Sequence, residues 1–420
     1  MYKVVIGLEV HCEVQTNSKN FSRSRNEYSE TPNINIDTVD IGLPGVLPVP
    51  NKEAVRKSLM MAMALNCKTP DVITFDRKNY FYPDLPKGYQ ITQMNKPVGI
   101  NGYVMINVDG EDIKVGIHDI HLEEDTASLD HFGEYSLIDY NRSGIPLLET
   151  VTEPCMHSAK EAIAFLEALR SIFLYCGVSE ARSDRGQMRC DVNISLMEEN
   201  ATELGTKVEM KNINSFNNVK LAIEYEIERQ TEVLISGGKV IQETRRFDDE
   251  DGKTYSMRSK VDAVDYKYYV EPNIPKVKVS DEWLKEIKAE IPPLQYDRIQ
   301  KYMGEYGLSR YDATILVKEK EIAEWFEEAI KEGSDPKTAA NWINGVILGH
   351  LSKYELSINN IFLKPKMLVN LIKMINDGKI SSKQGKEVMY KVLQDEKEPE
   401  VIVKELGIKQ IGNEEEIEKR

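Results

Sequence analysis

Short segments in which apolar and polar residues alternate recur through the first two thirds of the chain. In residues 2–14 one face is apolar, and the other ends in Glu9, His11, Glu13 and Gln15. Alternation with a period of two predicts a half-buried strand whose polar side chains all point the same way. Two further strands, 187–197 and 206–211, are predicted on the same grounds, and their polar faces carry Arg189, Asp191, Asn193, Lys207, Glu209 and Lys211.

Three helices are predicted among these strands, over residues 52–65, 158–176 and about 217–236. The second has the clearest ends. Ser158 followed by Glu161 is typical of a capping box, and Gly177 is typical of a helix stop.

The pattern changes after Pro292–Pro293, where short amphipathic helices follow one another with brief loops. Asp335–Pro336 predicts a helix start, with the cap residue followed by proline at the first helical position. Ser381, in Ser-Ser-Lys, is interpreted as another helix cap. A domain boundary is therefore expected near residue 293, and the charge-rich stretch after about 400 is expected to fray.

Composition excludes several classes of protein. The chain has 420 residues and a net charge of −15, from 54 basic and 69 acidic residues, which argues against a sequence-blind nucleic-acid binder. No run approaches ~18 apolar residues, so no membrane span is expected. The five cysteines form no CxxC pair, so a disulfide scaffold and a zinc ribbon are not expected and a reducing, cytoplasmic location fits.

A cation site can be predicted from strand spacing. Residues two apart on a strand lie roughly 6.5–7 Å apart on one face, so Glu9 and His11 can converge on one cation, although a solvated outer face is an equal alternative. The run His121–Asp125 is acidic, and alternation slips near His118–Asp119, where a bulge would re-aim the side chains. Asp191 is a third candidate, and oxygen-rich ligation suits Mg²⁺.

Other chemistries are less well supported. His118 and His121 with Glu123 or Glu124 would suit zinc, but that arrangement needs an HExxH helix where a strand is predicted. The chain has no P-loop, no GxGxxG and no GxSxG motif.

Residues 75–90 contain several cations and aromatic residues together with two prolines. They predict a rigid loop that either holds phosphates and stacks on bases or packs on the core.

Nine motifs in this order closely resemble the B-subunit family of bacterial aspartyl/glutamyl-tRNA amidotransferases. They are IGLEVHCEV, LPGVLPVPNK, FDRKNYFYPDLPKGYQI, HLEED, DYNRSGIPLLETVTEP, MRCDVNISL, GTKVEMKNINSF, ETRRF and MRSK. The resemblance implies an α+β fold: a cradle-shaped, mainly antiparallel sheet domain over 1–293, an all-α domain over 294–400, and the start of a truncated tail over 401–420, with the C-terminal tail domain largely absent.

The resemblance also implies an activity. Together with an amidase A subunit and a small C subunit, the family uses Mg·ATP to phosphorylate the side-chain carboxylate of misacylated Glu-tRNA(Gln) or Asp-tRNA(Asn). Ammonia released from glutamine by the amidase then displaces the phosphate. The alternatives are a non-catalytic tRNA-binding scaffold of the same fold and a free-standing metal hydrolase.

The resemblance also implies roles for particular residues of this chain, through the motifs in which they stand. Glu9, His11 and Glu124 are expected to bind Mg²⁺, with Glu123 and Asp191 as further catalytic carboxylates in or behind the ligand set. Lys78, Lys87 and Arg189 are expected to bind ATP phosphates. Glu149, Lys207, Glu209 and Lys211 are expected to line the substrate cavity or the ammonia path. Ser22, Ser24, Asp37 and Asp40 stand where many relatives have zinc-binding cysteines, so no structural zinc is expected.

Overall fold

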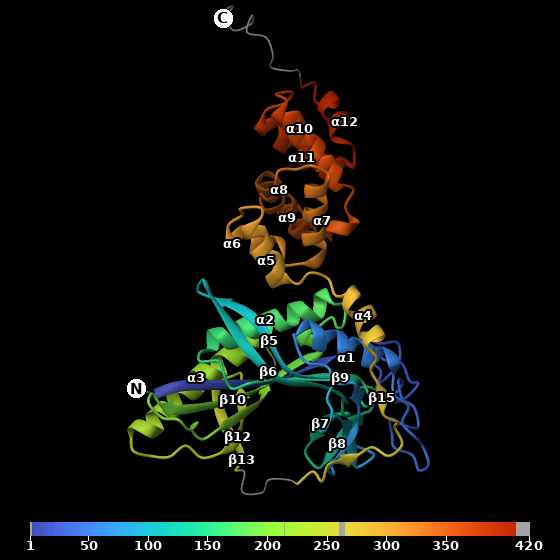
Figure 1. Cartoon of the computed structure of the whole chain (residues 1–420), viewed down its shortest axis with the longest axis vertical. Helices are drawn as coiled ribbons and strands as arrows, with labels where there is room; N and C mark the ends of the chain where they lie inside the picture. The colour runs from blue at the N-terminus through green and yellow to red at the C-terminus, as the bar shows by residue number, and fades with distance from the viewer. Residues whose placement is uncertain (1, 214, 260–264, 409–420) are drawn as a thin grey trace, which may run out of the picture. The chain divides into compact units, whose positions relative to one another are not determined.

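The computed structural model describes residues 2–213, 215–259 and 265–408, in two compact units, Met1–Pro292 and Pro293–Arg420 (Figure 1). The boundary between the units falls within the proline pair where the sequence pattern changes. Of the predicted tail 401–420, the part beyond 408 lies outside the described residues. In the described ranges, no helix is both long and apolar enough to cross a membrane.

A large sheet organises the first unit, in the order β13-β12-β11-β10-β1-β9-β6-β5. Every neighbouring pair is antiparallel except β11 and β12, which confirms the predicted α+β class with a mainly antiparallel sheet. The strands are β1 (Tyr2–Glu13), β5 (Gly99–Val108), β6 (Glu111–Glu124), β9 (Pro146–Thr152), β10 (Met188–Glu198), β11 (Val208–Ile213), β12 (Glu243–Asp248) and β13 (Lys253–Ser259).

Three helices pack together on one face of this sheet: α1 (Lys52–Ala64), α2 (Ala159–Tyr175) and α3 (Phe216–Ile235) (Figure 1). The hydroxyl of Ser158 accepts a hydrogen bond from the Glu161 amide and so caps α2 as predicted. The apolar side chains of β1, such as Val10 and Cys12, are buried. Because side chains alternate along a strand, Glu9 and His11 lie on the opposite face.

Short strands complete this unit. They are β2 (Val72–Ile73) with β15 (Val277–Lys278); β3 (Asp76–Asn79) with β4 (Tyr89–Thr92) and β14 (Tyr269–Val270); and β7 (Ser128–Phe132) with β8 (Tyr135–Asp139). The prediction of a loop over residues 75–90 was therefore wrong at both ends. Pairing of β3 with β14 brings Tyr266 and Tyr268 close to Lys78. The unit ends with α4 (Asp281–Glu290).

The second unit is helical around one apolar core that includes Phe326 and Leu371. The predicted helix after Asp335 is interrupted by a wider turn, Ile343–Ile347, between α8 and α9. Ser381 caps α11 as predicted, in a reciprocal capping box with Gln384. The helices of the second unit are α5 (Gln295–Gly304), α6 (Arg310–Leu316), α7 (Lys320–Lys331), α8 (Pro336–Trp342), α9 (Leu348–Tyr354), α10 (Pro365–Asn376), α11 (Ser382–Asp395) and α12 (Pro399–Glu405).

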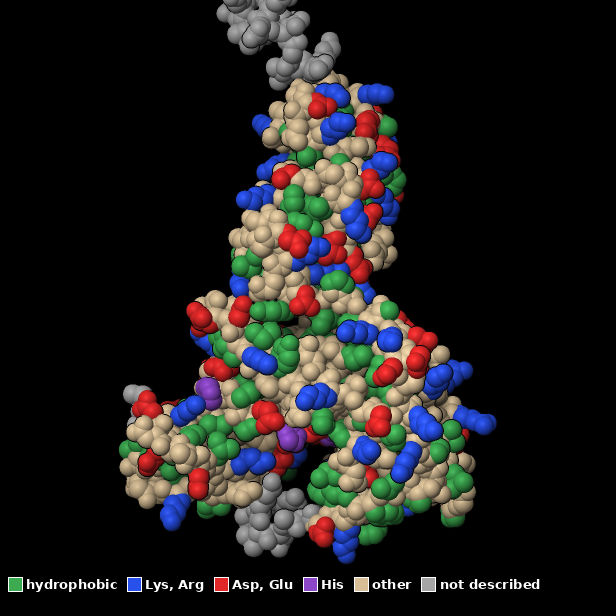
Figure 2. Space-filling model, in the orientation of Figure 1, with side chains coloured by type: hydrophobic (Ala, Val, Ile, Leu, Met, Phe, Trp, Pro, Cys, Tyr) green, Lys and Arg blue, Asp and Glu red, His purple; other side chains and the backbone are tan. Residues whose placement is uncertain are grey.

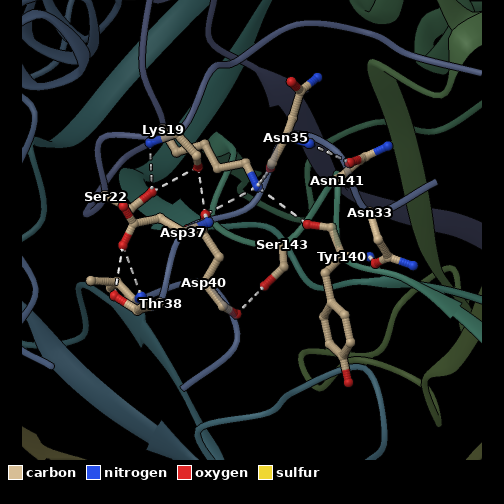
Figure 3. Close-up of polar contacts among 12 residues, drawn as sticks. Lys19, Ser22, Asn33, Asn35, Asp37, Thr38, Asp40, Tyr140, Asn141 and Ser143 are labelled. Carbon is tan, nitrogen blue, oxygen red and sulfur yellow. Dashed lines mark hydrogen bonds and ion pairs between the residues drawn. The ribbon is translucent and has the colours of Figure 1, made fainter. Parts of the chain in front are cut away.

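A buried lysine organises the long irregular segment between β1 and α1 (Figure 3). The Lys19 Nζ donates to the carbonyl oxygens of Asn35 (2.7 Å) and Tyr140 (3.2 Å) and lies 3.4 Å from Asp40 Oδ2. Four residues that the resemblance placed at the positions of zinc-binding cysteines, Ser22, Ser24, Asp37 and Asp40, meet in the same network. Asp40 accepts from the Ser24 hydroxyl and the Asp37 amide, and the Ser22 and Ser24 hydroxyls lie 2.9 Å apart.

Replacing Lys19 by methionine is expected to lower the free energy of unfolding of the first unit by roughly 3–5 kcal/mol, because it leaves the Asp40 carboxylate buried without its cation. Urea titration followed by circular dichroism measures the change. Arg25→Met is the matched control, since Arg25 pairs with Glu27 in the same segment but is 75% exposed. The control should change stability by about 0.5 kcal/mol or less. An equally small effect at Lys19 would contradict the prediction.

Candidate functional site

Strand register lines up polar residues in rows across the face of the sheet that the helices leave uncovered. His11 on β1 lies opposite Glu149 on β9, and Glu149 lies opposite His121 on β6. On the other side His11 lies opposite Arg189 on β10. A register shift between Ile117 and Asp119, at the predicted bulge, precedes His121 on β6.

Four side chains converge in what we call the histidine cluster: His11, His121, Glu123 and Glu149. Glu149 Oε2 lies 3.3 Å from His11 Nε2 and 3.0 Å from His121 Nε2. The Glu123 carboxylate oxygens lie 3.8 Å from His11 Nε2 and 3.9 Å from His121 Nε2. All four side chains are largely shielded from water, and Glu123 is only 5% exposed.

Burial and mutual charge act in opposite directions in the histidine cluster. Burial alone would lower the pKa of both imidazoles, but the carboxylates, Glu149 foremost, raise it above the usual value. Burial would raise the pKa of Glu149, but His11 and His121 hold it well below the usual value. Burial, followed by repulsion from Glu149, raises the pKa of Glu123. Two carboxylates held this close and largely shielded from solvent favour a cation between them.

Neighbouring residues orient the histidine cluster and close a cavity beside it. The His121 Nδ1 lies 2.7 Å from Asp119 Oδ1, an arrangement common behind metal-binding histidines. Lys78 lies beside a cavity of about 450 Å³ that Tyr268 and three residues of the cluster, His121, Glu123 and Glu149, also line. Burial would lower the pKa of Lys78, but Glu123, Tyr268 and Glu149 raise it, so Lys78 is a fixed positive charge. Its Nζ also lies 5.0 Å from the ring centroid of Tyr266.

A second group of carboxylates lies next to the first. Glu9 lies opposite Asp191 in the register of β1 and β10, and one oxygen from each of Glu9, Asp191 and Glu209 lies within 4.8 Å of the others. Lys211 Nζ already lies 2.6 Å from Asp191 and 3.2 Å from Glu209. The Asn193 amide donates to Glu9 at 2.8 Å. An internal ammonium group therefore balances part of this second group's charge.

The histidine cluster has the donor set that a divalent ion needs. Within the described part of the chain, two groups of three potential ligands meet within 4.8 Å: His11 with Glu123 and Glu149, and Glu9 with Asp191 and Glu209. One imidazole nitrogen and two carboxylate oxygens leave positions open for phosphate oxygens, which suits Mg²⁺. The first group fits the ion better because no lysine ammonium is paired with its carboxylates in the described structure.

The predicted magnesium ligands are therefore not gathered as predicted. Glu9, His11 and Glu124 do not form one of the two ligand groups found among the described residues. Glu124 follows Glu123 on β6, so the two side chains point to opposite faces. Its carboxylate accepts from the Ile91 amide at 2.9 Å and forms an ion pair with Lys87. The roles predicted for Glu124 as a metal ligand and Lys87 as a phosphate ligand both require this pair to open.

Other predicted residues lie outside the histidine cluster. Arg189 Nη2 lies 2.7 Å from Asp125 Oδ2, so this guanidinium is engaged by a buried carboxylate that also lies 3.4 Å from Arg142. Lys207 is exposed just before β11. His118, considered for zinc, is 63% exposed, pairs with Glu153 at 2.9 Å, and lies on a strand as predicted.

Sequence reasoning underestimated two residues of the site and missed two others. Glu149, expected only in a substrate cavity, is the centre of the histidine cluster. It sits in the buried strand Pro-Leu-Leu-Glu-Thr-Val-Thr, where a lone carboxylate among apolar residues was the available signal. His121 was named as the start of the acidic run and for zinc, but not among the expected magnesium ligands. Asp119 and Tyr268 carried no comparable signal in the sequence.

Fold and site together define a protein with a sheet-based catalytic domain followed by a helical domain, and comparison with known families supports this class. The family model described as the GatB/GatE catalytic domain matches residues 4–285. A second model, described as the GatB domain, matches residues 324–420.

Curated relatives make the assignment more specific. The chain is 48% identical over 419 residues to the B subunit of the aspartyl/glutamyl-tRNA(Asn/Gln) amidotransferase of Halalkalibacterium halodurans, covering 100% of this chain and 88% of the relative. The proteins of the same name from Brevibacillus brevis (47% identity; 98% and 87% covered) and Persephonella marina (46%; 100% and 88%) are similar. The chain belongs to the B-subunit family of aspartyl/glutamyl-tRNA(Asn/Gln) amidotransferases. The resemblance inferred from motifs is thereby confirmed, together with the predicted class of enzyme, a tRNA-dependent amide-forming ligase.

Proposed function

We propose that the first unit activates a side-chain carboxylate of misacylated tRNA with ATP and converts it to an amide. The substrate is Glu-tRNA(Gln) or Asp-tRNA(Asn), and the products are Gln-tRNA(Gln) or Asn-tRNA(Asn). The observation that carries the proposal is the histidine cluster, three of whose residues (His121, Glu123 and Glu149) line the same cavity as the half-buried cation Lys78. The family assignment supports it, since the relatives are named as amidotransferases.

The geometry suits this chemistry because a carboxylate is a poor acyl donor until one oxygen becomes a leaving group. Phosphoryl transfer requires little covalent chemistry from a protein, but it requires positioned positive charge around the phosphate oxygens. A magnesium ion held by His11, Glu123 and Glu149 would supply part of that charge. Lys78 supplies a second, fixed charge from β3. Asp119 holds the His121 ring in place beside Glu149.

The proposal extends to partners. The relatives are named as one component of a larger enzyme. We infer that an amidase A subunit supplies ammonia from glutamine and that a small C subunit completes a heterotrimer in the cytoplasm. Figure 2 shows basic and acidic side chains interspersed over the face in view, so tRNA binding there depends on local contacts more than on a broad basic surface.

The proposal is tested with the assembled complex, misacylated tRNA, Mg²⁺ and ATP. We expect ADP release that depends on misacylated tRNA, and amidated tRNA when glutamine is added. A matched reaction with the correctly charged tRNA should release no ADP. Amidation without ATP cleavage, or binding of tRNA with neither reaction, would contradict the proposal, and the second result would favour the scaffold alternative.

A further inference from the structure

Lys78 brings an ammonium group close to the two carboxylates of the histidine cluster without pairing with either. The charges of Glu123 and Glu149 both act on Lys78. In the described part of the chain, however, the ion pairs of these two carboxylates are with His11 and His121, and Lys78 has none. A flexible ammonium group beside two largely buried carboxylates ordinarily pairs with one of them, so a further feature of the structure holds it apart.

Two other lysines near the site show the ordinary outcome. Lys211 Nζ lies 2.6 Å from Asp191 Oδ2 and so neutralises part of the second group of carboxylates. Lys87 forms an ion pair with Glu124. If Lys78 behaved in the same way, its ammonium group would take the place of a divalent ion in the histidine cluster, and the cavity would lose its free positive charge.

Two tyrosine rings lie beside the Lys78 ammonium group. Its Nζ lies 5.0 Å from the ring centroid of Tyr266 and 6.0 Å from that of Tyr80, and the two rings contact each other edge to face. An ammonium group is attracted to the electron-rich face of an aromatic ring, and the second distance is at the limit of this attraction, so Tyr266 makes the stronger contact. Lys87 lies over one ring only, that of Tyr89 at 5.6 Å, and it is paired with a carboxylate.

The backbone of Tyr266 is fixed from the strand that carries Lys78. Asn79, the next residue of β3, donates its backbone amide to the Tyr266 carbonyl at 2.9 Å and its side-chain amide to the Lys267 carbonyl at 2.8 Å. Lys267 has a φ of 43°, in the left-handed region that residues other than glycine rarely adopt. Strained backbone persists only where its surroundings fix it, and here the hydrogen bonds from Asn79 do so. The ring of Tyr266 is therefore held next to Lys78 by more than its own packing.

We propose that Tyr266, together with Tyr80, is a positioning residue that keeps the Lys78 ammonium group away from Glu123 and Glu149. The two carboxylates then stay available for a divalent ion, and the ammonium group stays available for an anion. One cavity can thereby present opposite charges that do not cancel each other. The inference rests on the proposed function, because it explains how the proposed metal and phosphate positions coexist.

The test measures Mn²⁺ binding to the assembled complex without ATP, and the relevant site is the one that Glu149→Gln removes. Tyr266→Leu is expected to weaken Mn²⁺ binding at this site by about tenfold, because the released ammonium group competes with the ion for the carboxylates. Tyr266→Phe keeps the ring and should stay within about twofold of wild type. Tyr103→Leu is the matched control, because the Tyr103 ring lies 4.1 Å from Lys114 Nζ but does not line the cavity. This control should bind Mn²⁺ like wild type.

A double variant separates this effect from a loss of structure. In the Lys78→Met background there is no ammonium group to release, so adding Tyr266→Leu should leave Mn²⁺ binding unchanged. Equal weakening in both backgrounds would show a merely structural role and overturn the proposal, as would wild-type binding by a folded Tyr266→Leu variant or the lack of any Mn²⁺ site that depends on Glu149. If Tyr266→Leu does not assemble in gel filtration, Tyr80→Leu in the same two backgrounds decides. If the Mn²⁺ results are as expected but the wild-type complex cleaves no ATP, the proposed function fails and the positioning role stands.

Discussion

Glu149→Gln is expected to lower ATP cleavage by the assembled complex by about 10²–10³-fold. The carboxylate contacts both imidazoles of the histidine cluster, and its low pKa means that it carries a full negative charge at neutral pH. Glutamine keeps the shape but removes the charge that a divalent ion would neutralise. A magnesium titration at fixed ATP should therefore show half-maximal activity at a higher Mg²⁺ concentration than in wild type.

The control for Glu149→Gln is Glu153→Gln. Glu153 also contacts a histidine, His118, at 2.9 Å, but both side chains are largely exposed, so the substitution should leave ATP cleavage and the magnesium titration unchanged. Asp119→Asn should fall between the two, with a loss of about 10–100-fold, because Asp119 orients His121 from behind. If Glu149→Gln retained both the wild-type rate and the wild-type magnesium dependence, the histidine cluster would not be the metal site.

The strand pattern was the most informative part of the sequence. Alternation correctly predicted that Glu9 and His11 share a face, because a strand has only two faces and the core occupies one. The sequence did not show that His11 belongs to the histidine cluster while Glu9 belongs to the neighbouring group of carboxylates. Which residues they meet depends on the order of neighbouring strands, and that order places Glu149 across from His11 and Asp191 across from Glu9. Pairing between distant strands leaves no local signal.

The choice between Glu123 and Glu124 shows a second limit. A bulge near His118 was predicted and observed, but its effect on the following side chains depends on the register to β9. In the structure His121 and Glu123 face the cluster, and Glu124 turns to β4 and Lys87. Motif resemblance alone could not distinguish two adjacent glutamates. A shift of one residue along the strand decides which of them faces the histidine cluster.

Lys78→Met is expected to raise the Michaelis constant for ATP by about tenfold or more and to lower the rate of ATP cleavage, while glutamine hydrolysis by the amidase partner stays near wild type. Methionine keeps most of the length and removes the charge. Lys78 lines the cavity beside the histidine cluster, where its charge opposes those of Glu123 and Glu149. Initial rates at varied ATP, measured as ADP release, separate the effect on binding from the effect on turnover.

Lys114→Met is the matched control for Lys78→Met, because Lys114 also stacks on a tyrosine, with its Nζ 4.1 Å from the Tyr103 ring centroid, but it does not line the cavity. Its loss should leave both kinetic constants unchanged, which separates loss of cation–π packing from loss of charge at the site. Equal loss of ATP cleavage and glutamine hydrolysis in Lys78→Met would indicate a folding or assembly defect. An unchanged Michaelis constant would assign the phosphates to another cation, and Lys87, once released from Glu124, is then the residue to test.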